Sequence, residues 1–350
     1  MPDTIHSEDL PKDLHYVDDS QPGFTRKILR GKFAYFDTDG QRIRDEDEIK
    51  RINALVIPPA YTDVWICADR QGHLQATGRD ARGRKQYRYH PRWRAVRDEV
   101  KYERMIAFGK ALPQIRKQVD ADLRRSGLPR EKVLATIVYL LEATLMRIGN
   151  EEYARENKSF GLTTLRDRHV RLDGGKVQFR FRGKSGVHHA VEVQDRRLAR
   201  IIARIRDLPG QELFQYEDDD GNPHAIDSAD VNDYLHAITG ADYTAKDFRT
   251  WAGTVLAAVA LKEYEKYDSE AQAKKNVVQA IESVSKKLGN TPTICRKCYV
   301  HPAVIESYLD GSMLDALRRR AQQELKEDLH ALRPEEAAVL ALLQQRLKAG

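Results

Sequence analysis

The spacing of apolar residues changes near residue 95, and this change limits the folds open to the chain. Before it, short apolar runs such as 64–68 are separated by turn residues, which is typical of antiparallel strands. After it, apolar residues recur at helical spacing, as from Val133 to Leu145. We therefore expect an α+β chain with a small N-terminal antiparallel β-sheet domain, residues 1–92, and a larger, mainly α-helical domain, residues 93–350.

Prolines add detail to both parts. Pro58, Pro59 and Pro91 disfavour helices in the strand-rich part. Pro129 instead suits the first turn of a helix, and we expect that helix to end near Gly149–Asn150. Further helices are expected at 198–205, at 245–264 and in the tail beyond Ser312.

A block of strands interrupts the helical part. Three runs separated by glycine-containing turns, 169–172, 176–182 and 187–193, predict a three-stranded antiparallel sheet. In the middle run, apolar and polar residues alternate, so that one face of the sheet can pack and the other face stays polar. Lys184 falls in the second turn, where packing does not require a lysine.

The charge of the chain suggests a polyanionic partner. Its 350 residues carry a net charge of +6, and summed positive charge steers a protein toward polyanions. Within 79–97, eight Lys or Arg residues face one acid, Asp80, and are interleaved with Tyr87, Tyr89 and Trp93. Such residues neutralise phosphates and hydrogen-bond to the backbone of DNA. A solvated basic strand edge is the alternative, but the aromatic residues favour duplex DNA.

Other features limit the compartment and the cofactors. Three cysteines are too few for a disulfide framework, and the N-terminus lacks the character of a secretory signal. No apolar run is long enough for a membrane span. With DNA as the expected partner, we expect a cytoplasmic, nucleoid-associated protein. Cys295 and Cys298 with His301 lack a fourth zinc ligand, so no metal is expected. No glycine-rich phosphate loop suggests a nucleotide cofactor.

Four short windows carry residues suited to one reaction. Arg147 lies in L-M-R-I-G-N, Lys184 in F-R-G-K-S-G and Arg249 in K-D-F-R-T-W, while Asn290 and Tyr299 lie in G-N-T-P-T-I-C-R-K-C-Y. A phenol can attack a phosphodiester. Arginines and an amide can stabilise the charge that develops on its oxygens. A lysine can protonate the departing oxygen if nearby charge lowers its pKa.

Each of these residues also has an ordinary structural reading. Arg147 could be a surface charge at a helix end, and Arg249 could pair with Asp247 or Asp242. Only their joint occurrence favours catalysis. His188 and His189 lie beside the Lys184 turn, but adjacent strand residues point to opposite faces, so at most one faces a site. We favour a surface role for both.

These windows resemble the poxvirus-like branch of type IB DNA topoisomerases, in its bacterial form. The resemblance covers nearly the whole chain. Besides the four windows, it includes Leu74–Trp93, Arg147–Tyr153, Glu156–Leu165 and Lys246–Thr250.

The resemblance implies a role for each site residue. Tyr299 would attack one strand and become joined to its 3′-phosphate, Arg147 and Arg249 would hold that phosphate, and Lys184 would be the general acid. Asn290 would donate to a non-bridging oxygen. Viral members usually have histidine there, so this chain departs from them. The nicked strand would swivel and be resealed, and neither ATP nor an obligatory metal is implied.

The resemblance also implies the tyrosine recombinase/topoisomerase IB-like fold and a monomer clamped around duplex DNA, without membrane or nucleotide cofactor. Together with the basic stretch, it gives these candidate DNA contacts: Gln75, Arg79, Arg82, Arg84, Lys85, Tyr87, Tyr89, Tyr153 and Lys246.

Two alternatives remain open. A tyrosine recombinase or integrase shares the fold and the chemistry, but such proteins typically carry His-x-x-Arg where this chain has Lys246-Asp-Phe-Arg249. A non-catalytic duplex DNA-binding protein with a degraded site is the other.

Overall fold

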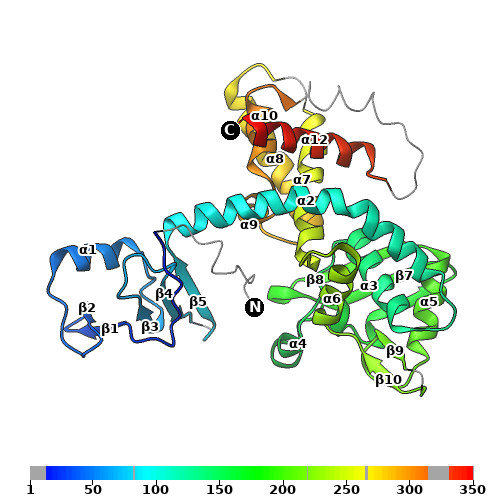
Figure 1. The fold of residues 1–350 in the computed structure, drawn as a ribbon, viewed down its shortest axis with the longest axis horizontal. Coiled ribbons are helices and arrows are strands. Elements are labelled where there is room, and N and C mark those ends of the chain that lie inside the picture. The colour runs from blue at the N-terminus through cyan, green and yellow to red at the C-terminus, as the bar shows by residue number, and fades with distance from the viewer. Residues whose placement is uncertain (1–12, 82, 219, 265–266, 314–330, 350) are drawn as a thin grey trace. The chain divides into compact units, whose positions relative to one another are not determined.

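The computed structural model describes residues 13–81, 83–218, 220–264, 267–313 and 331–349 (Figure 1). For residues 94–101, 153 and 347–349 it describes the backbone alone. The chain forms two compact units, 1–103 and 104–350.

The first unit is built on an antiparallel five-stranded sheet with strand order β2-β1-β3-β4-β5. Its core is a cluster of Ile52, Val64, Ile66 and Ala76, which packs helix α1 against the sheet. The expected N-terminal sheet is therefore confirmed. The elements of this unit are β1 (Phe24–Leu29), β2 (Lys32–Phe36), α1 (Glu46–Ala54), β3 (Thr62–Ile66), β4 (Leu74–Arg79) and β5 (Lys85–Tyr89).

Helix α1 and the start of α2 correct the expectation drawn from the prolines. The Asp45 side chain accepts hydrogen bonds from the backbone N–H groups of Asp47 and Glu48, so α1 has an ordinary N-cap well before Pro58. Pro91 does not exclude a helix either. It is the first residue of α2 (Pro91–Leu123), where the missing N–H of proline costs nothing.

The second unit is mainly helical and contains a three-stranded antiparallel sheet in the order β6-β7-β8. This sheet confirms the predicted block of strands, and the alternating burial of β7 agrees with its one apolar face. Its elements after α2 are α3 (Arg130–Thr144), α4 (Glu151–Asn157), β6 (Val170–Asp173), β7 (Lys176–Arg182), β8 (His188–Gln194), α5 (Arg196–Arg206), β9 (Gln215–Glu217), β10 (Pro223–Ala225), α6 (Ser228–Thr239), α7 (Ala245–Lys262), α8 (Glu270–Leu288), α9 (Pro292–Cys298), α10 (Pro302–Leu309) and α12 (Pro334–Ala349).

Helix α3 is the centre of this unit, in contact with α6, α7 and β8. It ends at Thr144 and not near Gly149–Asn150, because Leu145 adopts the left-handed conformation with φ of 56°. The expected helical tail beyond Ser312 is confirmed for α12, while residues 314–330 lie outside the described part.

Arg116 on α2 links α3 to α12. Nη2 of Arg116 lies 2.7 Å from Glu142 Oε1 on α3 and 2.8 Å from Glu336 Oε1 on α12. These side chains are largely shielded from solvent, so removing one member would leave an uncompensated charge. The network ties the end of the chain to the helices that position the site.

Candidate active site

Arg147 lies in a loop whose backbone is fixed by a second loop. The N–H of Leu162 donates to the Arg147 carbonyl at 2.9 Å, and that of Thr163 donates to the Ile148 carbonyl at 2.7 Å. A Cβ on Gly161 would lie 2.5 Å from the Gly149 nitrogen, so the two backbone segments can approach this closely only because residue 161 is glycine. The segments around Arg147 and Gly161 therefore act as one support for the arginine.

Arg147 and Asn290 meet across 143 residues of sequence. Arg147 Nη2 donates to Asn290 Oδ1 at 2.5 Å. Because a guanidinium can only donate, the amide oxygen must face it, which leaves Asn290 Nδ2 to point elsewhere. That nitrogen is buried and has no hydrogen-bond partner among the residues that the structure describes. Burial, together with the charge of Arg249, lowers the pKa of Arg147, although a guanidinium remains charged.

Arg249, on α7, ties together the ends of two other helices. Its Nη1 donates to the Leu145 carbonyl after α3, and its Nη2 donates to the Leu288 carbonyl of α8 at 2.7 Å. Carbonyl groups at helix ends lack partners within the helix, and this arginine supplies them. The side chain is 4% exposed, and its Nε has no partner within the described ranges. Asp247 is not its partner, because Arg104 bonds that carboxylate at 3.0 Å.

Tyr299 follows α9 and lies against α7. A Cβ on Gly253 would lie 2.7 Å from the Tyr299 carbonyl oxygen, so only glycine allows this approach. Gly253 is one helical turn beyond Arg249, and the guanidinium carbon of Arg249 lies 5.2 Å from the centre of the tyrosine ring. The ring is half-buried and is not sealed in an apolar interior.

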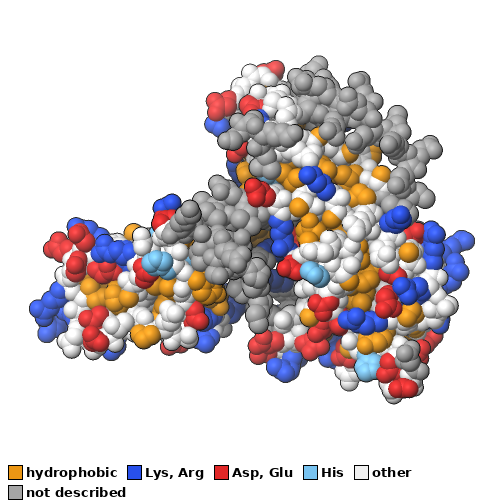
Figure 2. Space-filling model, in the orientation of Figure 1, with side chains coloured by type: hydrophobic (Ala, Val, Ile, Leu, Met, Phe, Trp, Pro, Cys, Tyr) orange, Lys and Arg blue, Asp and Glu red, His pale blue; other side chains and the backbone are white. Residues whose placement is uncertain are grey.

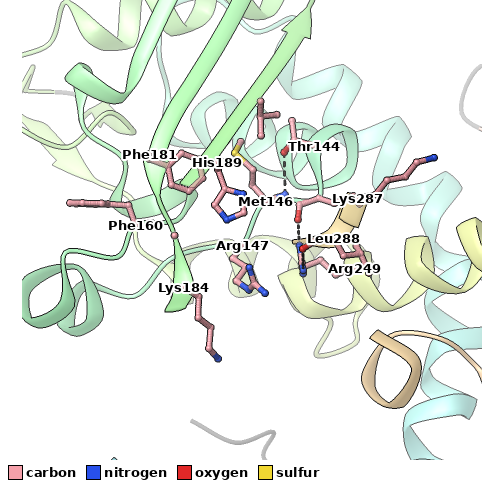
Figure 3. Close-up of a pocket in the computed structure, with 13 residues that line it drawn as sticks. Thr144, Met146, Arg147, Phe160, Phe181, Lys184, His189, Arg249, Lys287 and Leu288 are labelled. Atoms are coloured by element: carbon pink, nitrogen blue, oxygen red, sulfur yellow. Dashed lines mark hydrogen bonds between the residues drawn. The ribbon is translucent and has the colours of Figure 1, made fainter. Parts of the chain in front are cut away.

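Lys184 lies in the tight turn between β7 and β8. The turn is closed by a hydrogen bond from Gly183 N–H to the Val187 carbonyl at 2.7 Å. Lys184 lines one pocket with Arg147 and Arg249, but its side chain is exposed, and Figure 3 shows its ammonium group pointing away from both arginines. A rotation of this exposed side chain would be needed to bring the ammonium group toward a phosphate beside Arg147.

His189 lines the same pocket, and here the expected surface role was wrong. It is half-buried, whereas His188 is exposed on the other side of β8. Strand alternation correctly allowed one of the two to face the site, but only the register of β8 against β7 shows which one does. The pocket thus brings together residues from β7–β8, the loop after α3, α7 and the end of α8 (Figure 3).

Comparisons with known proteins agree with this arrangement. Residues 90–329 match the family described as eukaryotic DNA topoisomerase I, catalytic core. The chain belongs to the type IB DNA topoisomerases. Residues 32–80 also match the N-terminal domain of bacterial DNA topoisomerase IB.

Individual relatives extend over most of the chain. The DNA topoisomerase 1B of Acanthamoeba polyphaga mimivirus is 33% identical over 293 residues, covering 82% of this chain and 87% of the viral protein. The DNA topoisomerase 1B of vaccinia virus (strain Copenhagen) is 21% identical, with 80% and 88% covered. The DNA topoisomerase 1 of Schizosaccharomyces pombe is 29% identical over 171 residues, 48% of this chain and 20% of the yeast protein.

In this topoisomerase, one face of the N-terminal sheet gathers several of the predicted DNA contacts. Lys85, Tyr87 and Tyr89 alternate along β5 and so share a face. Arg79 lies directly opposite Lys85 in the register. The rings of Tyr87 and Tyr89 are nearly parallel, with centres 6.1 Å apart, and Tyr87 is 42% exposed. Arg88 points to the other face, where it donates to the Val56 carbonyl.

Carboxylates already neutralise much of this basic stretch, which the sequence window did not reveal. Asp80 was the one acid within the window, but the fold brings others from distant segments. Figure 2 shows acidic and basic side chains interspersed over the visible face of the first unit. DNA would therefore have to compete with the protein's own anions. The ion pairs are Asp19–Lys85 at 2.6 Å, Asp80–Arg84 at 2.8 Å, Asp63–Arg79 at 3.6 Å, and Asp13–Arg92.

The remaining predicted contacts differ in their placement. Gln75 is 2% exposed; its amide donates to the Gly72 carbonyl and accepts from Arg51, so the prediction that it contacts DNA finds no support. Lys246 is exposed in the first turn of α7, three residues before Arg249. Arg82 and the side chain of Tyr153 lie outside the described part of the structure.

The possible metal ligands near Tyr299 have other surroundings. Cys295 is buried, and burial raises the pKa of its thiol to about 11. His301 Nδ1 accepts the N–H of Ala303 and caps α10. Among the described residues, no group of three or more His, Cys, Asp or Glu side chains could hold a metal ion. None of the described helices has the length and apolar character needed to cross a membrane.

Proposed function

We propose that this topoisomerase relaxes supercoiled duplex DNA by transferring one strand to Tyr299 and back. The observation that carries the proposal is the meeting of three distant segments at one place. Arg147 donates a hydrogen bond to Asn290. Arg249 donates to the backbone carbonyls of Leu145 and Leu288, and its guanidinium group also lies against the ring of Tyr299. These side chains have the chemistry that phosphoryl transfer to a phenol requires.

In the forward step, the Tyr299 oxygen bonds to phosphorus and the bond from phosphorus to the 5′-oxygen breaks. The phenol proton passes to solvent, and Lys184 gives a proton to the 5′-oxygen. The product is a 3′-phosphotyrosine and a free 5′-hydroxyl. Negative charge that develops on the non-bridging oxygens is stabilised by Arg147, Arg249 and Asn290.

Two buried donors without partners fit this role. Asn290 Nδ2 and Arg249 Nε have no acceptor among the described residues, and buried polar groups are otherwise almost always paired. Two phosphate oxygens would supply acceptors for them. We therefore assign both nitrogens to the scissile phosphate.

Resealing is the reverse reaction. After the nicked strand has swivelled, the 5′-hydroxyl attacks the phosphotyrosine and releases Tyr299. One phosphoester replaces another in each direction, so no ATP is consumed. A monomer suffices, because each of these steps uses one copy of each residue. We infer that Arg79, Lys85, Tyr87 and Tyr89 hold the same duplex, and that the protein associates with the nucleoid.

The test is a plasmid assay with covalent capture. The protein should relax any supercoiled circle without ATP and in the presence of EDTA, and denaturant should trap a protein–DNA adduct. A requirement for paired recognition sites would instead indicate a recombinase. Binding without any adduct would leave a DNA-binding protein with no strand transfer.

Arg249→Lys should lower the rate of strand cleavage by about 10²–10³-fold, although the charge is kept. Arginine offers three nitrogens, for Leu145, Leu288 and the phosphate, whereas lysine offers one. Single-turnover cleavage of a duplex oligonucleotide measures the effect. Arg200→Lys, on the exposed side of α5, is the matched control. Near-normal cleavage by Arg249→Lys would contradict the assignment.

Asp19→Asn should tighten DNA binding by about three- to tenfold. It should also raise the number of counterions released on binding, measured from the slope of log K against log salt concentration, by about one. The Asp19 carboxylate accepts from Lys85 Nζ and from Thr77 Oγ1 at 2.8 Å, so it would compete with a phosphate for these donors. Fluorescence anisotropy at about 50 to 200 mM salt, with Tyr299→Phe added to prevent cleavage, measures this. Asp39→Asn removes the same charge from a loop elsewhere in the unit. An equal gain from both variants would show a general charge effect.

A further inference from the structure

We propose that His189 is a positioning residue for Lys184. Its imidazole fills the space between the turn that carries Lys184 and the turn that carries Asn290, and so fixes the direction from which the lysine reaches the leaving oxygen. The inference rests on the proposed function and adds a residue to it.

The ring of His189 is held from one side by the sheet. His189 on β8 lies directly opposite Phe181 on β7, so both side chains share a face. Their rings are stacked, with centres 5.0 Å apart and an angle of 18° between the planes. Phe181 is itself 6% exposed. The buried phenylalanine therefore sets the plane of the imidazole.

Two neighbouring sides of the ring lie close to glycines. A Cβ on Gly183 would lie 2.6 Å from Cδ2 and Nε2 of His189, and a Cβ on Gly289 would lie 3.1 Å from Cε1. Gly183 precedes Lys184, and Gly289 precedes Asn290. The imidazole is thus a spacer between the two turns, and the absence of side chains at both glycines lets it approach their backbone.

We expect the Lys184 turn to depend on this contact. Ser185 and Gly186 both have positive φ, 62° and 79°, and Lys184 and Ser185 are exposed. A lysine side chain has four rotatable bonds, so the placement of its Cα strongly affects where the ammonium group can go. A misplacement of about 1 Å can cost about 10²-fold in rate. Without the ring, the turn would lose its support on the side of the phosphate site.

The charge of the site favours a spacer over a second proton donor. Burial, then the charges of Arg147 and Arg249, hold the pKa of His189 below its usual value of about 6.5. Lys184 and Lys287 also line the pocket, so the charged side chains around the imidazole are all cationic. These surroundings disfavour a proton on the ring, so we infer that it acts through its shape.

The test uses two substrates that differ in one atom. His189→Ala should slow single-turnover cleavage at an ordinary 5′-oxygen by about 10–10²-fold. With a 5′-sulfur at the scissile phosphate, the variant should remain within about threefold of the parent protein, because a thiolate leaves without a proton. His189→Phe, which keeps a flat ring without nitrogens, should restore most of the rate with oxygen.

His188→Ala is the matched control, since it removes the same side chain from the next position on the opposite, exposed face. It should cleave both substrates at the parental rate. Equal loss with both leaving groups in His189→Ala would overturn the inference, because the ring would then support the fold or the phosphate site. A His189→Phe variant as slow as His189→Ala would overturn it too, by showing that a nitrogen is required. Failure of the parent protein to form any adduct would instead remove the proposed function itself.

Discussion

Tyr299→Phe leaves a protein that still binds duplex DNA but relaxes no supercoils and forms no denaturant-resistant adduct; this is the largest effect we expect. The change removes one oxygen, which is the proposed nucleophile. The ring can stay in place, because its contact with Arg249 at 5.2 Å and the backbone packing at Gly253 do not involve that oxygen. Loss of activity would therefore not reflect loss of structure.

Three measurements separate these outcomes. Plasmid relaxation reports turnover, denaturing electrophoresis with labelled DNA reports the adduct, and anisotropy reports binding. Tyr267→Phe is the control, because it removes a phenol oxygen that bonds the Tyr308 carbonyl in the same unit. That variant should still relax plasmids and form the adduct. An adduct formed by Tyr299→Phe would assign the nucleophile to another residue.

Lys184→Ala should slow cleavage at a 5′-oxygen by about 10²–10⁴-fold, the usual contribution of a general acid. The same variant should cleave a 5′-sulfur substrate at nearly the parental rate, since sulfur needs no proton to leave. Lys184 is exposed at a turn, so its removal creates no cavity and should not affect folding.

Lys176→Ala is the matched control for that experiment. It lies at the other end of β7 and pairs with Glu192 at 3.1 Å, far along the strand from the site. It should cleave both substrates normally. Equal loss with both leaving groups in Lys184→Ala would mean that the lysine holds the phosphate and does not supply a proton.

The fold was predictable from sequence wherever local pattern and tertiary packing agree. The three-stranded sheet is such a case, because alternation in β7 and glycine turns both specify it. The end of α3 was not, because Leu145 turns left-handed, and the loop after it is held by hydrogen bonds from Leu162 and Thr163. No local signal near residue 145 encodes those bonds, whereas Gly149 offered a misleading one.

The candidate site was predictable as a set of residues but not as a geometry. The sequence motifs identified Arg147 and Asn290 as site residues, but their spacing in the chain does not predict the hydrogen bond between them. Likewise, the acids within one stretch of sequence do not include those that the fold brings from elsewhere. The pairing of Asp19 with Lys85 was therefore not predictable before the fold was known. His189 was missed because strand alternation gives two faces and does not say which one meets the site.

The contact between Arg147 and Asn290 has a consequence for pH–rate profiles. With its oxygen held by an arginine, Asn290 can present only an NH₂ group, which neither gains nor loses charge near neutral pH. Arginine also keeps its positive charge in proteins. The groups that we propose hold the phosphate are therefore not expected to change charge near neutral pH, and a bend in the pH–rate profile there would report another group. A viral relative with histidine at this position would carry one more titrating group.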